Sequence, residues 1–307
     1  MSALTPGELR ARVASLSVWT QGDQRAPHKP LLLLYALARF QQGQTRLPFT
    51  AVEEPVRELL DTFGSPRAYH HPSYPFWRLQ TDGLWTLDGT EGVVQRKSNS
   101  DPTVTSLRAV DPTGGFPDEV QAAFRAYPPL VGEVAHALLD AHFPTSIHDE
   151  LLDAVGLDTD TAATSRTRRR RDPAFREAVL TAYERKCAVC GFEVRVGPAL
   201  VGVDAAHVMW HQAGGPDEVP NGLALCALHH RLLDRGAFTL TSVGSYETVV
   251  EVAETAHGGE GFERWLLDYH GRPIARPVSA SYRVAEPSVA WHRREVFRGP
   301  ARERTTV

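Results

Sequence analysis

The feature that most constrains this chain is a stretch from 186 to 238 that contains all three cysteines of the protein. Cys187 and Cys190 form a C-x2-C pair, and Cys226 and His229 form a C-x2-H pair. Tetrahedral zinc takes thiolate and imidazole ligands from two such pairs, and its binding lets a segment with little apolar surface fold. Three unrelated core cysteines are the alternative, because a buried cysteine often acts as a small hydrophobic residue. The regular spacing favours a structural Zn2+ site.

Four more polar side chains in the same stretch suggest a hydrolytic site: Asp204, His207, Asn221 and His230. The apolar run VGVDAAHVMW predicts a strand around His207, whereas the spacing of NGLALCALHHRLLD predicts a helix that opens at Asn221. On such a helix Cys226 and His230 would lie near one face, with His229 displaced by one position. The zinc ligands and His230 are therefore expected to point to different sides of one turn.

These residues resemble the HNH nucleases with a ββα-metal fold, in particular the zinc-stapled branch found in McrA-type restriction enzymes. The segments Asp204-Ala-Ala-His207 and Asn221 to His230 match that signature without gaps, and the resemblance covers about residues 172–245. It implies metal-dependent hydrolysis of a phosphodiester bond. His207 would be the general base, His230 a ligand of a catalytic Mg2+ or Mn2+ ion, and Asn221 a second ligand or the residue that orients His207.

The chain departs from this family at one position. Many relatives carry an acidic or histidine metal ligand directly before the general base, where this chain has Ala206. Asp204, three residues before His207, is the candidate substitute. The predicted group around the catalytic metal is therefore His230, Asp204 and Asn221.

The charge of the chain excludes a protein that coats DNA indiscriminately, because its formal net charge is −4. Binding to phosphates needs local positive charge rather than a basic total. The clearest local source is Arg166 to Arg171, which contains five arginines, although such a run can also be a solvated linker. The polar segment 156–171 is predicted to be an Arg-rich interdomain linker.

The cellular compartment of the protein is inferred from four features of the sequence. The chain has no apolar run long enough to span a membrane, and its N-terminus lacks the regions of a signal peptide. Cysteines that bind metal fit a reducing cytoplasm. Abundant Ala, Arg, Gly and Pro with few Lys is typical of a GC-rich bacterial genome. We therefore expect a cytoplasmic bacterial protein with no membrane partner.

Periodicity along the chain predicts an α+β protein with a mainly helical N-terminal domain and a small β-hairpin. The resemblance implies that the linker joins this domain to a zinc-stapled ββα-metal domain. The predicted domains are 1–155, the linker 156–171, an HNH domain 172–270 and a C-terminal tail 271–307. Helices are expected at 6–19, 28–42, 50–63, 117–126, 129–142, 147–155, 173–186 and 260–268, a hairpin at 76–80 and 84–87, and strands at 237–242 and 247–253.

The N-terminal region carries a second resemblance. The segments HKPLLLL from His28, HPSYPFWRL from His71 and GLW from Gly83 resemble the sulfur-binding domains fused to HNH modules in McrA-type enzymes, over about residues 5–155. Those domains recognise phosphorothioate DNA, in which sulfur replaces a non-bridging phosphate oxygen. The resemblance implies that Tyr74 and Pro75 line a sulfur pocket. It also implies that His28 and Lys29 hold the phosphate backbone at a helix N-terminus.

Residue type adds candidates outside the matched segments. Gln21, Gln24 and Arg25 precede the His28 helix and are candidates for reading base edges in a groove. Arg67, Arg96 and Lys97 are candidates for contacts with the DNA backbone. An apolar pocket favours sulfur, because an oxygen placed there would lose its water without gaining a partner.

The sequence therefore predicts a restriction endonuclease that recognises double-stranded phosphorothioate DNA and cuts near the mark. A homodimer would place two active sites on the two strands. One alternative is an HNH nuclease directed to methylated or otherwise modified bases, which would need a base-flipping pocket. Another is a catalytically silent zinc module that only binds DNA. The presence of His207, Asn221 and His230 together argues against that module.

Overall fold

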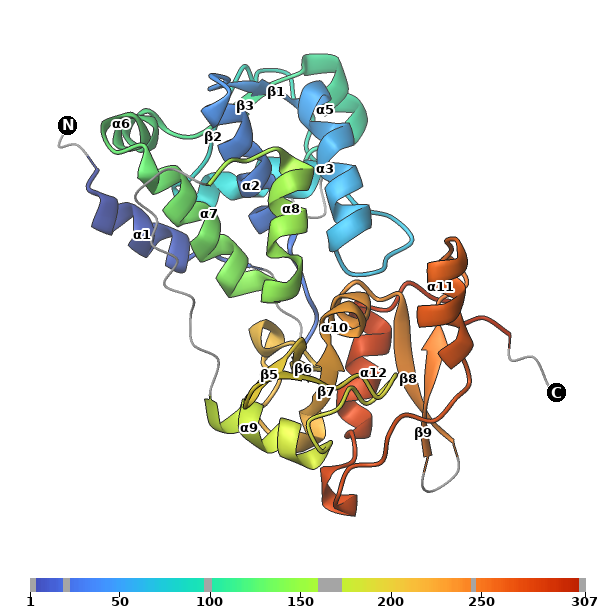
Figure 1. Ribbon diagram of the computed structural model, residues 1–307. Coiled ribbons are helices and arrows are strands. Elements are labelled where there is room, and N and C mark those ends of the chain that lie inside the picture. The colour runs from blue at the N-terminus through green and yellow to red at the C-terminus, as the bar shows by residue number, and fades with distance from the viewer. Residues whose placement is uncertain (1–3, 19–22, 97–100, 160–172, 244–246, 304–307) are drawn as a thin grey trace. The chain divides into compact units, whose positions relative to one another are not determined.

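The computed structural model describes residues 4–18, 23–96, 101–159, 173–243 and 247–303. The chain forms two compact units, unit 1 from Met1 to Thr167 and unit 2 from Arg168 to Val307 (Figure 1). The arginine run of the predicted linker lies outside the described residues. The first residues of that predicted linker are packed in unit 1, since Leu157 and Thr159 are buried.

Unit 1 is mainly helical, as predicted. Its α-helices are α1 (Pro6–Ala14), α2 (His28–Gln41), α3 (Phe49–Phe63), α4 (Ser73–Arg78), α5 (Val104–Val110), α6 (Asp118–Ala126), α7 (Pro129–His142) and α8 (His148–Val155). Helix α1 begins where predicted, because Thr5 and Glu8 form a capping box and Pro6 is the first helical residue. The helix itself ends earlier than predicted.

Helix α2 is the centre of unit 1. Leu31, Leu32, Leu34 and Leu37 are fully buried, and apolar side chains surround most of the helix. A helix that is hydrophobic on every side must be covered, and α3, α4, α7 and α8 all pack against α2. Each buried leucine contributes about 1.5–3 kcal/mol of transfer free energy. Unit 1 is therefore stabilised by apolar burial around one helix.

A row of aromatic rings extends this core. Phe49 contacts Phe76 at 5.1 Å between ring centroids, and Phe76 contacts Trp85 at 5.9 Å. Trp85 contacts Phe116 at 6.4 Å, and Phe116 contacts Phe124 at 5.3 Å. All four contacts are edge-on, a geometry that aromatic quadrupoles favour. The row connects α3 and α4 to α6.

The hairpin predicted at 76–80 and 84–87 is wrong. The first segment is helical, as α4 followed by the 3-10 turn η1 (Leu79–Asp82). Phe76 and Leu79, three residues apart, are both buried on one side of this helical segment, so the apparent alternation was a helical repeat. The small sheet is instead three-stranded, with β3 (Thr113–Gly115) between β1 (Leu47–Pro48) and β2 (Thr86–Asp88).

Unit 2 combines small antiparallel sheets with short helices. Its elements are α9 (Pro173–Ala182), β4 (Val194–Val196), β5 (Ala199–Val201), β6 (Val203–His207), β7 (Gly222–Cys226), α10 (Ala227–Asp234), β8 (Phe238–Val243), β9 (Glu247–Val252), α11 (Glu260–Trp265) and α12 (Glu286–Glu295), with 3-10 turns at His211–Ala213, Val219–Asn221, Leu267–Tyr269 and Ala280–Tyr282. The strands pair as β4–β5, β6–β7 and β8–β9. The predicted strands at β6, β8 and β9 are confirmed.

The helix predicted to open at Asn221 begins later. Residues 222–226 form the fully buried strand β7, which pairs with β6, and α10 follows directly. Cys226 has extended backbone geometry at the helix N-cap, so it does not share a helical face with His230 as predicted. Gly222 is needed here, since a Cβ at this position would lie 2.4 Å from Val179 of α9. The run of buried apolar residues fits a buried strand as well as a helix.

The predicted C-terminal tail is part of unit 2. It contains α12, on which Trp291 and His292 are fully buried. The His292 ring contacts the Thr239 hydroxyl at 2.9 Å and the Leu233 carbonyl at 2.9 Å. The segment therefore packs onto β8 and α10 and helps to fix the nuclease unit. Among the described residues, no helix has the length and apolar character needed to cross a membrane.

Candidate nuclease and DNA-binding sites

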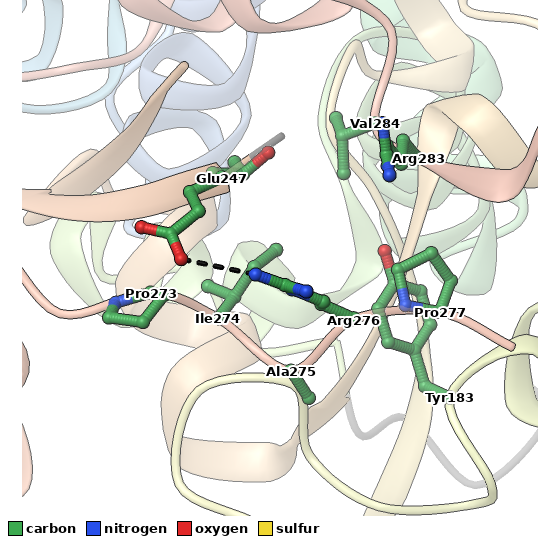
Figure 2. A pocket seen from close by; sticks show the side chains of 10 residues that line it. Tyr183, Glu247, Pro273, Ile274, Ala275, Arg276, Pro277, Arg283 and Val284 are labelled. Atoms are coloured by element: carbon green, nitrogen blue, oxygen red, sulfur yellow. Dashed lines mark hydrogen bonds and ion pairs between the residues drawn. The ribbon is translucent and has the colours of Figure 1, made fainter. Parts of the chain in front are cut away.

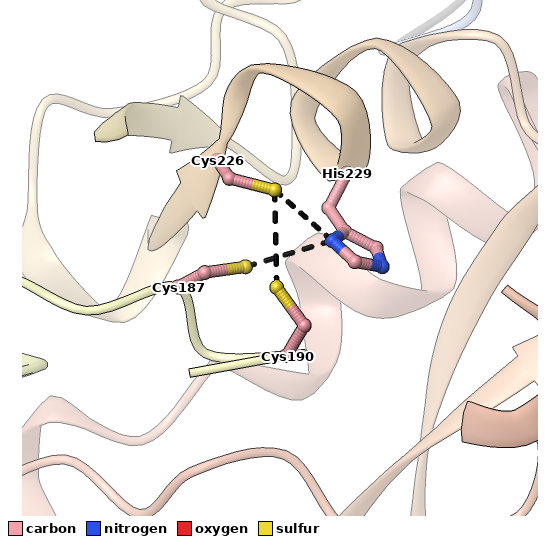
Figure 3. Close-up of side chains that lie close together, drawn as sticks. All are labelled: Cys187, Cys190, Cys226 and His229. Carbon is pink, nitrogen blue, oxygen red and sulfur yellow. Dashed lines mark hydrogen bonds between the residues drawn. The ribbon is translucent and has the colours of Figure 1, made fainter. Parts of the chain in front are cut away.

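The two predicted zinc pairs come together in unit 2 (Figure 3). The Cys187 Sγ lies 3.7 Å from Nδ1 of His229, and the Cys226 Sγ lies 3.1 Å from the same nitrogen. The sulfurs of Cys190 and Cys226 are 3.9 Å apart. Tetrahedral zinc separates its sulfur and nitrogen ligands by about 3.4–3.8 Å. The group therefore fits a zinc ion, with two ligands before β4 and two at the start of α10.

The surroundings of this Cys3His group suit a structural metal. The Nε2 of His229 lies 2.9 Å from the Trp265 carbonyl, which accepts its proton and leaves Nδ1 for a metal. Contacts with Cys187, Cys190 and His229 lower the pKa of the Cys226 thiol and favour the thiolate that zinc binds. Both Cys187 and His229 are fully buried. Cys226 is buried as well and Cys190 is half-buried, so the group is largely shielded from solvent, as in sites where the metal has only protein ligands.

His207, the predicted general base, ends strand β6. Its ring stacks on Phe175 of α9, with centroids 4.2 Å apart and planes 18° apart. Its Nε2 lies 2.7 Å from the Oδ1 of Asp217, in the loop between β6 and β7. A hydrogen bond to a carboxylate fixes the tautomer of an imidazole. His207 is therefore held by a ring on one side and a carboxylate at its edge.

Asn221 has a structural role that the sequence did not predict. Its side chain is buried, and its Oδ1 accepts from the Met209 N–H at 2.9 Å. Its Nδ2 donates to the carbonyls of Met209 and Pro216, each at 3.0 Å. The amide thereby closes the loop that carries Asp217. Because its oxygen already accepts a backbone proton, the geometry does not support the predicted use of Asn221 as a metal ligand.

The structure places Asp204, the predicted partner of His230, against Arg176. Asp204 lies on the face of β6 opposite His207, because the two are an odd number of residues apart in one strand. Its Oδ1 accepts from Nε of Arg176 at 2.7 Å. The carboxylate beside His230 is instead Asp234, one helical turn later, with 3.3 Å between Nε2 and Oδ2.

Three residues close to His207 and His230 were not predicted from the sequence: His211, Asp217 and Asp234. The i,i+4 spacing of His230 and Asp234 on a helix was a usable signal. The loop of His211 and Asp217 has no repeating pattern, so nothing in the sequence placed these side chains beside His207.

In unit 1 three of the predicted DNA-binding residues, His28, Arg67 and Tyr74, belong to a cluster around His28, which begins α2. The His28 ring lies 6.0 Å from that of His70. The Tyr74 ring lies 4.9 Å from the His71 ring and 5.0 Å from the Arg78 guanidinium. Burial, together with nearby positive charge, lowers the pKa of His28 to about 4. This His28 cluster, which we define as His28, Arg67, His70, His71, Tyr74 and Arg78, concentrates positive charge at one end of α2.

Several predicted contacts have other roles in the fold. Lys29 forms an ion pair with Asp82 at 2.5 Å. Arg25 is buried and donates to the Phe63 carbonyl at 3.0 Å, so it holds α3 and is not placed to read a groove. Of the remaining predicted residues, Pro75 is buried, Gln24 and Tyr74 are half-buried, Arg67 and Arg96 are exposed, and Gln21 and Lys97 lie outside the described residues.

A small cavity in unit 2 lies apart from these groups. It has a volume of about 20 Å3 and is lined by Tyr183, Arg276 and residues around them (Figure 2). Arg276 forms an ion pair with Glu247 at 3.1 Å, and the Tyr183 hydroxyl has no hydrogen-bond partner among the described residues. The volume suits one water molecule, which would satisfy that hydroxyl. We assign this cavity to packing.

Comparison with known families decides the identity of unit 1. Residues 6–160, half of the chain, match the family described as ScoMcrA-like, DNA sulfur-binding domain. The chain belongs to this family. Residues 187–241 match the HNH endonuclease family and include both zinc pairs together with His207, Asn221 and His230. Unit 2 therefore contains an HNH endonuclease domain, and the chain is a DNA endonuclease.

Solved structures similar to unit 1 include two isolated domains and one larger enzyme. The sulfur binding domain of ScoMcrA complexed with phosphorothioated DNA is 26% identical, with 48% of this chain and 94% of that chain covered and a TM-score of 0.43. The sulfur binding domain of SprMcrA complexed with phosphorothioated DNA is 25% identical, with 50% of this chain and 94% of that chain covered and a TM-score of 0.41. The Type IV phosphorothioation-dependent restriction endonuclease ScoMcrA is 25% identical, with 48% of this chain covered and a TM-score of 0.41. The match covers 27% of that chain, about a quarter of the enzyme. A comparison with curated proteins found no match.

Proposed function

We propose that this protein is a restriction endonuclease that binds phosphorothioate DNA through unit 1 and hydrolyses a phosphodiester bond through unit 2. The observation that carries the proposal is the union, in one chain, of a sulfur-binding family domain and an HNH unit whose histidine base is held in place. The sulfur-binding domain would bind the modified DNA. The HNH unit would hydrolyse it.

Recognition is proposed to occur at the His28 cluster. The half-buried Tyr74 ring, next to the buried Pro75, offers an apolar contact for a polarisable sulfur atom. Around it, the exposed Arg67 supplies positive charge toward the phosphate backbone, whereas Arg78 is paired with Asp101. Because its pKa is about 4, His28 is neutral near pH 7 and contributes a hydrogen bond rather than a charge. The start of α2 adds the partial positive charge of a helix N-terminus.

Hydrolysis is proposed to depend on His207 as the general base. Asp217 accepts the Nε2 proton, which leaves Nδ1 of the neutral imidazole to take a proton from the attacking water. Stacking on Phe175 keeps the ring in one orientation. Asn221 acts indirectly by closing the loop that presents Asp217.

The divalent metal is proposed to bind at His230 and Asp234. An imidazole nitrogen and a carboxylate oxygen 3.3 Å apart, both nearly buried, are a donor set that suits such an ion. When bound, a divalent cation stabilises negative charge on the scissile phosphate and the leaving oxygen. Zn2+ at Cys187, Cys190, Cys226 and His229 is proposed to have a structural role only.

Each HNH site cuts one strand, so cleavage of a duplex is proposed to involve two copies of the chain. The arginine-rich segment between the two units would then limit how far from the mark unit 2 can cut. Analytical ultracentrifugation on marked DNA tests this part, since a 1:1 complex with full double-strand cleavage would exclude it.

The central experiment compares two duplexes of the same sequence, one with a phosphorothioate link, in Mg2+ and in Mn2+. We expect cleavage of the sulfur duplex alone. His207→Ala should reduce cleavage about 10²–10⁴-fold while binding persists. His257→Ala, an exposed histidine of unit 2, is the matched control and should cut normally. Equal cleavage of both duplexes would remove the sulfur reader from the proposal, and unchanged cleavage by His207→Ala would remove the general base.

A further inference from the structure

The loop between β6 and β7 brings a second histidine and a carboxylate to the proposed general base. Asp217 Oδ1 lies 2.7 Å from Nε2 of His207 and 3.4 Å from Nδ1 of His211. The rings of His207 and His211 are 5.8 Å apart. One ligand atom from each of the three residues lies within 4.8 Å of the others. This group, which we call the base triad, shares no residue with the Cys3His group or with the His230–Asp234 pair.

The donor set of the base triad suits a transition metal. Two imidazoles and one carboxylate are the ligands of open zinc sites, in which water fills the remaining position. Tetrahedral zinc would place these ligand atoms about 3.3 Å apart. The Asp217–His211 distance already fits, and the shorter Asp217–His207 distance needs a small displacement. The side chains of His211 and Asp217 are 59% and 34% exposed, so they can make that adjustment and an ion can reach them.

We propose that the base triad binds a transition-metal ion such as Zn2+ and that this ion switches the nuclease off. Binding is argued from the geometry alone, whereas the switch rests on the proposed function of His207. Mg2+ prefers oxygen ligands and octahedral geometry, so it should leave this group alone. Zn2+ at His230 and Asp234 would also stop cleavage, so the contribution of the base triad is the part of the inhibition that depends on His211.

The switch follows from the tautomers of His207. A neutral imidazole carries one proton, and with Asp217 as acceptor that proton is on Nε2. Zn2+ bound at Nε2 forces the proton onto Nδ1, and Asp217 then ligates the ion. The nitrogen that takes the proton of water is no longer available. One proton moves from Nε2 to Nδ1, and none is gained or lost by the imidazole.

The test uses the full chain with its structural zinc and does not depend on cleavage alone. Co2+ is titrated into wild type, His211→Ala and the control His257→Ala, and visible absorption and metal per chain are measured. We expect wild type and the control to bind one ion more than His211→Ala. In Mg2+, added Zn2+ should inhibit wild type and the control, and the concentration for half inhibition should rise about 10–100-fold or more in His211→Ala. Inhibition is expressed relative to the cleavage of each protein without added Zn2+, and without Zn2+ the control His257→Ala should cut as wild type does.

The outcomes separate the two proposals. Equal metal content in all three proteins would overturn the base triad as a metal site, whatever they cut. An extra ion that depends on His211 but leaves cleavage unaffected would overturn the switch. If no DNA is cut under any condition, the proposed function fails, and the Co2+ titration still decides whether the metal site exists.

Discussion

The two units of this chain solve the problem of folding in different ways. Unit 1 surrounds one apolar helix, α2, whose leucines are fully buried by four other helices. Unit 2 has two-stranded sheets and short helices, and its Cys3His group joins the start of β4 to the start of α10. Isolated two-stranded hairpins are marginal in water, so the sheets of unit 2 depend on the apolar core that they share with α9 and on the metal clip. We expect unit 1 to depend on packing alone and unit 2 on packing together with its ligands.

The sites of the two units also differ in the structure that positions their side chains. The His28 cluster uses side chains at a helix start, where backbone N–H groups already point outward. In unit 2 the general base is positioned by a loop that a buried amide closes. A binding site can therefore rest on an intact helix, whereas the nuclease site requires a chain of specific contacts.

The largest effect should come from breaking the Cys3His group. In Cys187→Ser, unit 2 should lose its cooperative fold, because structural zinc contributes about 10–16 kcal/mol in small zinc-binding peptides. Hydrogen exchange followed by mass spectrometry, which reports on each unit separately, should show loss of protection in β6, β7 and α10 and none in α2. Val196→Ser, on exposed β4, is the control. Full protection of unit 2 in Cys187→Ser would show that its apolar core is sufficient.

A smaller effect is expected from a cavity in unit 1. Leu34→Ala should lower the free energy of unfolding of unit 1 by about 2–5 kcal/mol, because Leu34 is fully buried in α2. The loss should be the same with and without a strong zinc chelator. Urea unfolding followed by hydrogen exchange measures it, with the exposed Val94→Ala as control. A chelator-dependent loss would contradict the division between the units.

The smallest effect concerns how the stability of unit 1 depends on pH, and it adds to the comparison between the two units. Burial lowers the pKa of both His28 and His142 to about 4, whereas histidines of an unfolded chain take up protons near pH 6.5. The unfolded state therefore binds more protons between these values, and stability is lost as pH falls from about 6.5 toward 4. A shift of this size corresponds to a loss in unit 1 of at most about 3 kcal/mol per buried histidine as the pH reaches 4. His28→Asn should reduce that slope, and an unchanged slope would show that His28 does not contribute.

Much of unit 1 was predictable from local sequence. The start of α1 follows from Thr5, Pro6 and Glu8, and the buried run after His28 predicts a covered helix. The segment from 76 to 80 was mispredicted, because Trp77, Arg78, Leu79 and Gln80 alternate as in a strand, whereas the buried pair Phe76 and Leu79 has the spacing of a helix. Only packing of Phe76 between Phe49 and Trp85 decides between them.

In unit 2, the sequence by itself determined the ligand types and their order along the chain. The Cys and His pairs could be identified from their local spacing, which the chemistry of zinc fixes, and His207, Asn221 and His230 were singled out by the resemblance to HNH nucleases. Tertiary structure decided which carboxylate joins each histidine. Asp217 reaches His207 through a loop, and Asp204 turns to Arg176 on the other face of β6. Such contacts depend on strand pairing and on loop closure by Asn221, which act between residues distant in sequence and leave no periodic pattern.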